Sequence, residues 1–330
     1  MNRKLPYEPA LDGLRAIAVG IVVAGHLFPE TFTSGWVGVN VFFVLSGYLI
    51  TRLLMQEIDE TGTIKLGRFY LRRALRLMPP LWTLLLVLLP LILVGNHRQS
   101  EFWSWSMTSS YLMNFNRAFG WGSDYGLGHT WSLAEEEQFY WLWPVLLLLG
   151  AWKWPKLTVG AAFTGVTLWR LYLYQHGASL ERIYNGPDTD SDAILAGCFL
   201  ALLHIPTRIE RLITALWPVW FGVVIYIAAE VGGVRSPALI ASMSVSAIAG
   251  AAIIVSTKKS LLERLLSTKP LVFTGKISYA LYLWHFPLIV FMNAKWHFTG
   301  SKILIPVILA YFISVVSHFT IEAYARHLKR

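Results

Sequence analysis

Long apolar segments recur along nearly the whole length of this 330-residue chain. Each runs for about 17 to 22 residues, which lets a helix cross a hydrocarbon core of about 30 Å. Charged residues make up only 14% of the sequence, against roughly 25% in soluble domains. A single soluble domain cannot bury so many apolar runs in its core. The sequence therefore predicts an all-α polytopic membrane protein, in which residues 1–330 form one bundle of about ten transmembrane helices.

The loops between the apolar runs carry basic residues very unevenly. The predicted spans cover residues 9–28, 36–54, 78–95, 131–150, 156–174, 191–205, 214–230, 237–256, 272–293 and 303–321. With a cytoplasmic N-terminus, the inner segments hold nineteen basic residues: Arg3, Lys4, Arg52, Lys65, Arg68, Arg72, Arg73, Arg76, Lys153, Lys156, Arg208, Arg211, Lys258, Lys259, Arg264, Lys269, Arg326, Lys329 and Arg330. The outer segments hold six: Arg98, Arg117, Arg182, Arg235, Lys295 and Lys302. By the positive-inside rule both termini are cytoplasmic.

Charge and cysteine content exclude several classes of protein. Juxtamembrane basic residues are attracted to anionic lipid headgroups, which accounts for the net charge of +9 without nucleic acid. The lone Cys198 lies in an apolar run, so the sequence predicts no disulfide framework. No histidines or cysteines have metal-ligand spacing, and we expect no metal. The first span is long and lacks a small-residue cleavage pattern, so no cleavable signal peptide is expected.

The first span contains two ionisable residues, Arg15 and His26. Eleven residues of helix make about three turns and rise about 16 Å, so both side chains face the same way. Ionisable groups within a membrane are costly and tend to mark functional pathways. The alternative is that Arg15 is a snorkelling anchor and His26 an interfacial side chain.

An arginine-rich segment, GRFYLRRALRLMPP, precedes the third span. Arg68, Arg72 and Arg76 are four residues apart and form one cationic stripe on a helix, while Arg73 lies three before Arg76. We expect an interfacial helix, with the prolines at 79–80 resetting the chain into the next span. The stripe is either a membrane-surface anchor or a phosphate-binding cluster suited to a cytosolic nucleotide-bearing substrate such as coenzyme A.

The fourth span begins with HTWSLAEEEQFYWLWP, in which Glu135, Glu136 and Glu137 are consecutive. A helix N-terminus favours acidic residues, although it does not require three. At least one carboxylate is expected to point into the bundle, where it would orient a histidine or accept a proton. Spacing places Tyr140 on the face of Glu136, and we consider Tyr140 and His129 candidate substrate contacts.

Two other spans carry polar side chains that hydrocarbon would penalise. Asn40 lies among small residues that favour close helix packing, and its amide needs a partner. The ninth span contains Tyr279, Tyr282 and His285. His285 is about thirteen residues, or roughly 20 Å, from the cytoplasmic start of that span, a depth comparable to that of His26. We take Asn40, Tyr282 and His285 as candidate substrate contacts, although one such histidine is more often a packing residue.

The outer loop 96–130 is rich in aromatic residues and long enough to contain a short surface helix. Its aromatic rings form either an interfacial belt or stacking surfaces for a sugar acceptor. They include Trp103, Trp105, Tyr111, Trp121 and Tyr125.

Five of these motifs occur together in one order, and the chain resembles the membrane acyltransferase-3 family over essentially its whole length. Members are bacterial O-acyltransferases that modify cell-surface and exported glycans. The matching motifs are the R-x10-H pattern of Arg15 and His26, GVNVFFVLSGYLI, the RRxxR pattern ending in Arg73 and Arg76, SLAEEEQFY and ISYALYLWHFP. Relatives often have Asp where this chain has Asn40, which leaves a charged role there open.

The resemblance implies a ten-span bundle in the bacterial inner membrane that takes an acyl group from cytosolic acyl-CoA, usually acetyl-CoA. The acceptor would be a glycan or lipid-linked oligosaccharide on the far side, such as exopolysaccharide. Many relatives carry an SGNH-type domain; we expect none here. The donor phosphates would dock at Arg15, Arg72, Arg73 and Arg76.

Combining the resemblance with the residues, we expect His26 to act as general base, oriented by Glu136 or Glu137, or to carry the acyl group transiently. Two other functions are a transporter or flippase, whose ionisable residues would line a substrate path, and an acyltransferase for a small molecule. The acyl group, the acceptor and the oligomeric state stay open.

Overall fold

The computed structural model describes residues 6–94, 98–232, 237–258, 260–298 and 300–328. Within these ranges the regular structure is entirely helical, which confirms the all-α prediction. Some of the basic residues in the predicted loop-charge count lie outside the described residues, namely Arg3, Lys4, Arg235, Lys259, Lys329 and Arg330. The chain divides into unit 1, Met1–Ile64 with Leu142–Lys276, and unit 2, Lys65–Trp141 with Ile277–Arg330. Each unit is described by itself.

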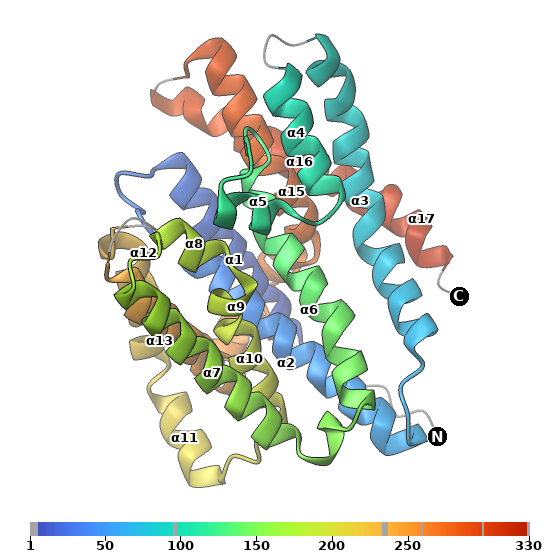
Figure 1. Cartoon of the computed structure of the whole chain (residues 1–330), viewed down its shortest axis with the longest axis vertical. Coiled ribbons are helices and arrows are strands. Elements are labelled where there is room, and N and C mark those ends of the chain that lie inside the picture. The colour runs from blue at the N-terminus through green and yellow to red at the C-terminus, as the bar shows by residue number, and fades with distance from the viewer. Residues whose placement is uncertain (1–5, 95–97, 233–236, 259, 299, 329–330) are drawn as a thin grey trace. The chain divides into compact units, whose positions relative to one another are not determined.

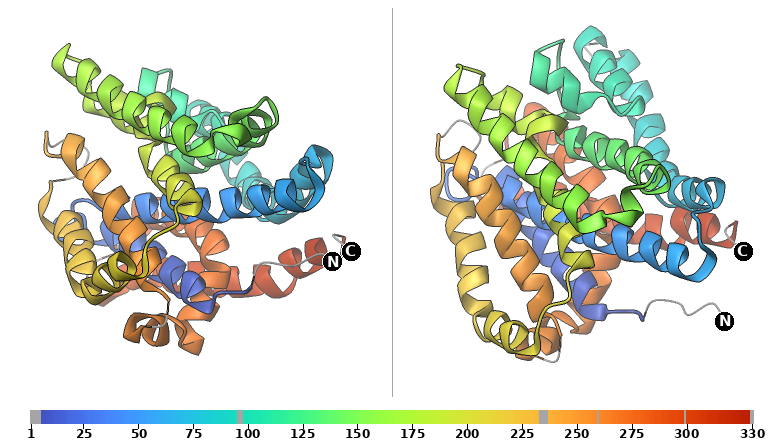
Figure 2. Two further views of the ribbon diagram at one scale, coloured as in Figure 1. Left: turned by 90° about the horizontal axis from the view of Figure 1, so that it is seen from below. Right: turned by 60° about the horizontal axis from the view of Figure 1, so that its bottom comes forward.

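Unit 1 contains most of the helices labelled in Figure 1. They are α1 Pro9–Leu27, α2 Trp36–Thr61, α7 Pro155–Gln175, α8 Leu180–Asn185, α9 Pro187–Asp190, α10 Asp192–Leu202, α11 Thr207–Ala215, α12 Trp217–Glu230, α13 Leu239–Ser256 and α14 Leu261–Leu266. Helices α12 and α13, in yellow and orange, run side by side in both views of Figure 2.

Unit 2 contains α3 Leu66–Val94, α4 Arg98–Ser109, α5 Met113–Phe119, α16 Ile305–Phe319 and α17 Ile321–His327. One boundary between the units lies between α2 and α3, and the other two fall inside α6 Trp131–Leu148 and α15 Lys269–Trp296. Helix α3 packs against α4 and α17. Two phenol hydroxyls fix neighbouring segments of unit 2: Tyr279 donates to the Leu77 carbonyl at 2.9 Å, and Tyr70 donates to the Trp141 carbonyl at 2.9 Å.

Six of the described helical segments are long and apolar enough to cross a membrane, or seven if the bent pair α11 and α12 counts as one span. The predicted number of about ten is therefore not confirmed. Helix α10, at 11 residues, is only about 16 Å long, too short for a hydrocarbon core of about 30 Å. The three glutamates of α6 reduce its hydropathy.

Glycines let the helices of unit 1 pack closely. A side chain at Gly47 of α2 would overlap the carbonyl of Ile194 on α10, and one at Gly197 of α10 would overlap the carbonyl of Val44. On α1, a side chain at Gly25 would meet the backbone of Gly35. The small residues of the second span thus serve close packing, as predicted.

Helix α3 corrects the prediction for the arginine-rich segment. The prolines at 79–80 were expected to separate an interfacial helix from the third span, but α3 continues through them from Leu66 to Val94. The two prolines remove two backbone hydrogen-bond donors. However, buried leucines continue along α3 on both sides of the proline pair, from Leu77 to Leu88. Burying one unbroken apolar face favours one unbroken helix.

Candidate active site

Arg15 and His26 both lie on α1, as predicted. Arg15 is ion-paired with Asp12, with 2.6 Å between Arg15 Nη1 and Asp12 Oδ1, and Tyr7 donates to the other Asp12 oxygen at 2.7 Å. His26 is half-buried in the last turn of the helix. Asp12 was not among the predicted site residues, although its position three residues before Arg15 is typical of a helical ion pair.

Asn40 links two helices of unit 1. Its amide nitrogen donates to Ser246 Oγ at 2.8 Å and to the Met243 carbonyl at 3.3 Å, both on α13. The residue is fully buried, and Oδ1 has no hydrogen-bond partner among the described residues. The polar partner that the sequence analysis required is therefore on α13, while a substrate contact at Asn40 stays a prediction.

A buried ion pair in unit 1 escaped the sequence analysis. Arg170 of α7 lies 2.8 Å from Asp192 of α10, and both side chains are almost completely buried. Ser244 of α13 bridges them, accepting from Arg170 at 2.5 Å and donating to Asp192 at 2.7 Å. An arginine within an apolar span was the available signal, because such a charge needs a partner. The pair ties three helices of unit 1 together.

In unit 2 the arginines of α3 point in different directions. Arg68, Arg72 and Arg76 are exposed, as a stripe with a four-residue repeat should be. Arg73 turns inward, where its Nη2 lies 3.4 Å from Glu137 Oε1 and its guanidinium lies 3.4 Å from the centroid of the Tyr140 ring. The predicted donor-binding arginines of α3 thus divide into the exposed Arg72 and Arg76 and the ion-paired Arg73.

The three consecutive glutamates of α6 have different surroundings. Glu137 faces Arg73, and Tyr140 donates a hydrogen bond to Glu136. Glu135 is buried, with 1% of its surface exposed. Because the Tyr140 ring lies on the Arg73 guanidinium while its hydroxyl binds Glu136, the four side chains form one connected group. We name Arg73, Glu136, Glu137 and Tyr140 the arginine–glutamate cluster; it contains one cation, paired with Glu137, and a second carboxylate, Glu136, bound by Tyr140.

A second group in unit 2 contains His129, Tyr282 and His285, all buried. The His129 ring centroid lies 5.3 Å from that of Tyr282 and 5.4 Å from that of His285. The Tyr282 hydroxyl donates to the His129 carbonyl at 2.7 Å, so its oxygen accepts from Ser132 Oγ at 2.6 Å. These three predicted substrate contacts therefore form one buried cluster, which we name the histidine cluster, and Ser132 is an addition that sequence analysis missed.

The tautomer of His285 follows from its partners. Its Nδ1 lies 2.7 Å from the Tyr282 carbonyl and 3.2 Å from the Leu281 carbonyl. A carbonyl oxygen only accepts hydrogen bonds, so Nδ1 carries the proton. In the neutral ring Nε2 is then the acceptor, as a base or hydrogen-bond acceptor requires.

Loop 96–130, predicted to be long enough for a short surface helix, contains two helices, α4 and α5. Asn114 of α5 and Gln138 of α6 exchange hydrogen bonds of 2.9 and 3.0 Å, and Gln138 also donates to the Tyr111 carbonyl at 2.8 Å. Asn116 accepts from Trp103 at 2.8 Å. These amides were not singled out from the sequence because their partners are distant in the chain or in turns.

The predicted orientation of His26 by Glu136 or Glu137 concerns residues of unit 1 and unit 2, and it stays a prediction. The same holds for the equal depth of His26 and His285 and for the joint binding of the donor by Arg15, Arg72, Arg73 and Arg76.

Comparison with known proteins identifies the kind of protein that carries these clusters. The family model described as an acyltransferase domain, acyltransferase-3, matches residues 8–323. A Staphylococcus aureus protein with the provisional name of O-acetyltransferase is 34% identical, over 88% of this chain and 52% of its own length. The peptidoglycan O-acetyltransferase OatA of Listeria monocytogenes is 32% identical, over 90% of this chain and 52% of its own length. The OatA O-acetyltransferase of Staphylococcus aureus is 32% identical, over 87% of this chain and 51% of its own length.

The chain spans about half the length of the curated relatives it matches. No solved structure matches it. The family model covers far more than half of the chain, including both clusters of unit 2 and the first helix with Arg15 and His26. The chain therefore belongs to the acyltransferase-3 family.

Proposed function

We propose that this chain is a membrane O-acetyltransferase, which moves an acetyl group from cytosolic acetyl-CoA to a hydroxyl of a glycan on the far side of the bacterial inner membrane. The acceptor is a surface polysaccharide or its lipid-linked precursor. Relatives named as O-acetyltransferases, one of them specific for peptidoglycan by its name, support the reaction class. The observation that carries the proposal is the gathering of predicted site residues of unit 2 in two clusters, of which the histidine cluster is buried and the arginine–glutamate cluster is partly buried.

The reaction needs a base near the acceptor. The sugar oxygen forms a bond to the thioester carbonyl carbon, the carbon–sulfur bond breaks, and the hydroxyl proton ends on the coenzyme A thiol. A sugar hydroxyl is a weak nucleophile at neutral pH, and a positioned base accelerates such a step by about 10² to 10⁴. We assign this role to His26, as general base or transient acyl carrier. Glu136 or Glu137 orients it in this proposal.

The exposed stripe Arg68, Arg72 and Arg76 supports a donor site on the cytosolic surface. Guanidinium groups bind phosphate through paired hydrogen bonds, and three of them at a four-residue repeat match the several phosphates of coenzyme A. Arg73 already faces Glu137 at 3.4 Å. We therefore assign phosphate binding mainly to the stripe, and to Arg73 the positioning of Glu137.

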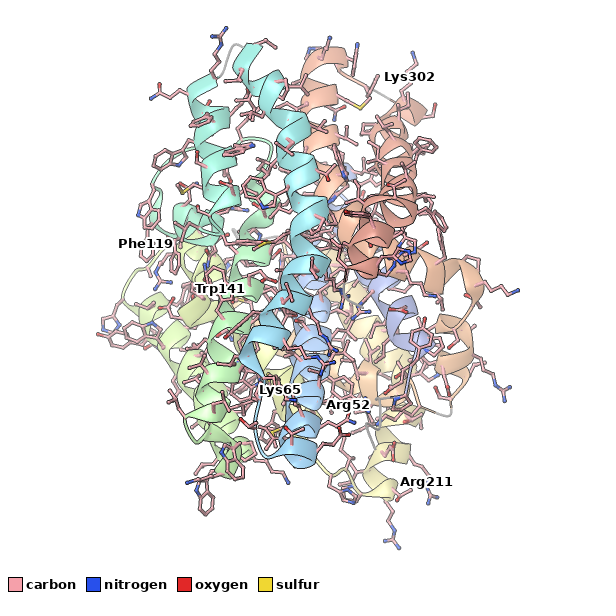
Figure 3. The ribbon with its side chains drawn as sticks, turned by 90° about the vertical axis from the view of Figure 1, so that its right-hand side faces the viewer. Arg52, Lys65, Phe119, Trp141, Arg211 and Lys302 are labelled. Carbon is pink, nitrogen blue, oxygen red and sulfur yellow. The ribbon has the colours of Figure 1, made fainter. Side chains whose placement is uncertain are left out.

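An aromatic cluster in loop 96–130 supports a sugar acceptor. Phe115, Phe119 and Trp121 stack on one another, with ring centroids 6.0 to 6.3 Å apart, and Phe119 and Trp121 are about half exposed. Figure 3 shows Phe119 on the outside of unit 2. Exposed aromatic faces offer an apolar surface for the C–H face of a sugar ring.

The experiment measures release of coenzyme A thiol from acetyl-CoA by the protein in lipid nanodiscs, with a glycan or lipid-linked sugar extract from the host. Wild type is compared with His26→Ala, and His176→Ala serves as control because His176 is exposed at the end of α7. We expect release that requires the extract, persists in the control and falls by at least about 10² in His26→Ala.

Radiolabelled acetyl groups in the glycan fraction identify the product. Labelled glycan formed at equal rates by wild type and His26→Ala would remove His26 from the mechanism. If extract-dependent release is missing for several acyl-CoAs, while the protein moves a lipid-linked sugar across the bilayer, the transporter function replaces this proposal.

A further inference from the structure

Unit 1 contains a cavity of about 310 Å³ that the proposed reaction does not use. Helices α2, α10, α11 and α13 contribute to its walls. Its polar lining includes Arg52, His204, Glu210 and Lys258, and apolar side chains such as Ile254 complete it. Small-molecule sites begin at about this volume and combine apolar walls with few polar groups. The cavity is large enough for a headgroup.

Arg52 is held in place within this cavity. Its Nη1 donates to Glu8 at 2.6 Å and to the Tyr48 hydroxyl at 2.9 Å. Both bonds use the same nitrogen, and among the described residues Nη2 and Nε have no acceptor, so their hydrogens can bind another one. Lys258 also lines the cavity and is exposed. The cavity therefore presents a fixed guanidinium and a movable ammonium.

The charge of the lining selects among phosphate ligands. Arg52 and Lys258 contribute two positive charges; Glu210 contributes one negative charge, and Glu8, ion-paired with Arg52, contributes another, so the site is close to neutral. A phosphodiester carries one negative charge, whereas coenzyme A carries several on its phosphates. The lining thus suits a phosphodiester better than the nucleotide end of the donor.

Helix α11 places the cavity at a membrane surface. None of its residues is buried, and Ile209 and Leu212 expose 50% and 61% of their surface, beside Arg208 and Arg211. A short helix with exposed apolar and basic side chains lies in the interface between lipid and water. Helix α11 meets α12 at a bend of 53°. Figure 3 shows Arg52 and Arg211 toward the same end of unit 1.

We propose that this cavity is a binding site for the phosphodiester headgroup of an anionic membrane lipid. The phosphate lies between Arg52 and Lys258, and the acyl chains extend toward the apolar side chains of α11. Basic pockets between transmembrane helices are suited to such headgroups. The assignment does not depend on the acetyltransferase reaction.

The experiment measures lipid binding by native mass spectrometry, with phosphatidylglycerol, phosphatidylcholine or acetyl-CoA added to the detergent-solubilised full chain. Lys258→Gln removes one lining charge, and Ala201→Trp fills the cavity without changing charge. Lys156→Gln is the matched control, since Lys156 is also an exposed lysine of unit 1. Each basic residue contributes about 1 kcal/mol to the attraction for an anionic lipid. Lys258→Gln should therefore bind phosphatidylglycerol about fivefold more weakly than wild type.

We expect phosphatidylglycerol to bind more tightly than phosphatidylcholine, Ala201→Trp to lose that preference, and Lys258→Arg and Lys156→Gln to keep it. Equal binding of both lipids by wild type, or unchanged binding in Lys258→Gln, would overturn the proposal. Displacement of phosphatidylglycerol by acetyl-CoA, lost in Ala201→Trp, would assign the cavity to the donor instead. If Ala201→Trp does not fold, the proposal is tested by comparing phosphatidylglycerol binding by Lys258→Gln with that by Lys258→Arg.

Discussion

Single residues in unit 1 show how a membrane bundle accommodates charge. Arg170 and Asp192 are buried together at 2.8 Å and share Ser244. Arg182 and Asp188 form a pair of similar length, 2.6 Å, but Asp188 exposes 43% of its side chain. Only the first pair would leave an uncompensated buried charge if one partner were removed.

Replacing Arg170 by Met should destabilise the protein by about 3 to 5 kcal/mol, because Asp192 would remain buried and unpaired. Arg182→Met removes an arginine from a pair open to water and should cost about 0 to 1 kcal/mol. Thermal unfolding of both variants in the same detergent measures the difference. Equal losses in the two variants would show that burial does not govern the Arg170 pair.

At the scale of elements, helix packing in unit 1 depends on glycines that allow backbones to touch. Gly47 and Gly197 lie at the contact between α2 and α10, where a Cβ would overlap a carbonyl oxygen. Gly222 of α12 has no neighbouring atom within 4 Å of the position of an added Cβ. Identical substitutions at these sites therefore separate packing from helix propensity.

Gly47→Ala should destabilise the protein by about 1 to 3 kcal/mol, because α2 and α10 must move apart. Gly222→Ala should be neutral or stabilise it by up to about 1 kcal/mol, since alanine favours a helix. Unfolding midpoints of the two variants, measured side by side, give the comparison. A Gly47→Ala variant as stable as wild type would contradict the close contact.

Helix α3 combines a surface stripe with one inward arginine. Changing Arg72 and Arg76 together to Gln should raise the KM for acetyl-CoA by about tenfold or more and leave kcat nearly unchanged, because phosphate binding contributes equally to ground and transition states. Lys153→Gln with Lys156→Gln is the control of equal charge. The kinetics of coenzyme A release provide both constants. A lower kcat at unchanged KM would place the stripe in catalysis instead.

At the scale of the whole molecule, the positive-inside rule predicts the direction of unit 2 across the membrane from its basic residues. Figure 3 shows Lys65 and Lys302 at opposite ends of unit 2. The positive-inside rule assigns Lys65 to the cytoplasm and Lys302 to the far side. Cys198 is the chain's single cysteine and is fully buried, so a new surface cysteine can be labelled selectively.

We expect Lys302→Cys to react with a membrane-impermeant maleimide in intact cells, and Lys65→Cys to react only after permeabilisation. Labelling of the isolated protein is quantified by mass spectrometry, with wild type as the unlabelled control. The reverse pattern would invert the predicted topology, and labelling of both in intact cells would place both ends of unit 2 on one side.

The apolar runs alone determined that the protein is helical and crosses a membrane, because hydrocarbon thickness sets the length of a spanning helix. Local spacing also determined which residues share a helix face, as for Arg68, Arg72 and Arg76. The number of membrane spans could not be determined from the apolar runs. A short helix such as α10 or an acidic one such as α6 is apolar on average without meeting the requirements of a span.

Tertiary structure decided which polar groups are partners. Arg170 and Asp192 are 22 residues apart, and Asn40 and Ser246 are 206 apart. The sequence pattern indicates that burying such polar groups is unfavourable. Which group offsets that cost depends on how separate helices pack. The same reason explains α3, where the sequence predicted a break at the prolines at 79–80 and the burial of one continuous leucine face favoured a single helix instead.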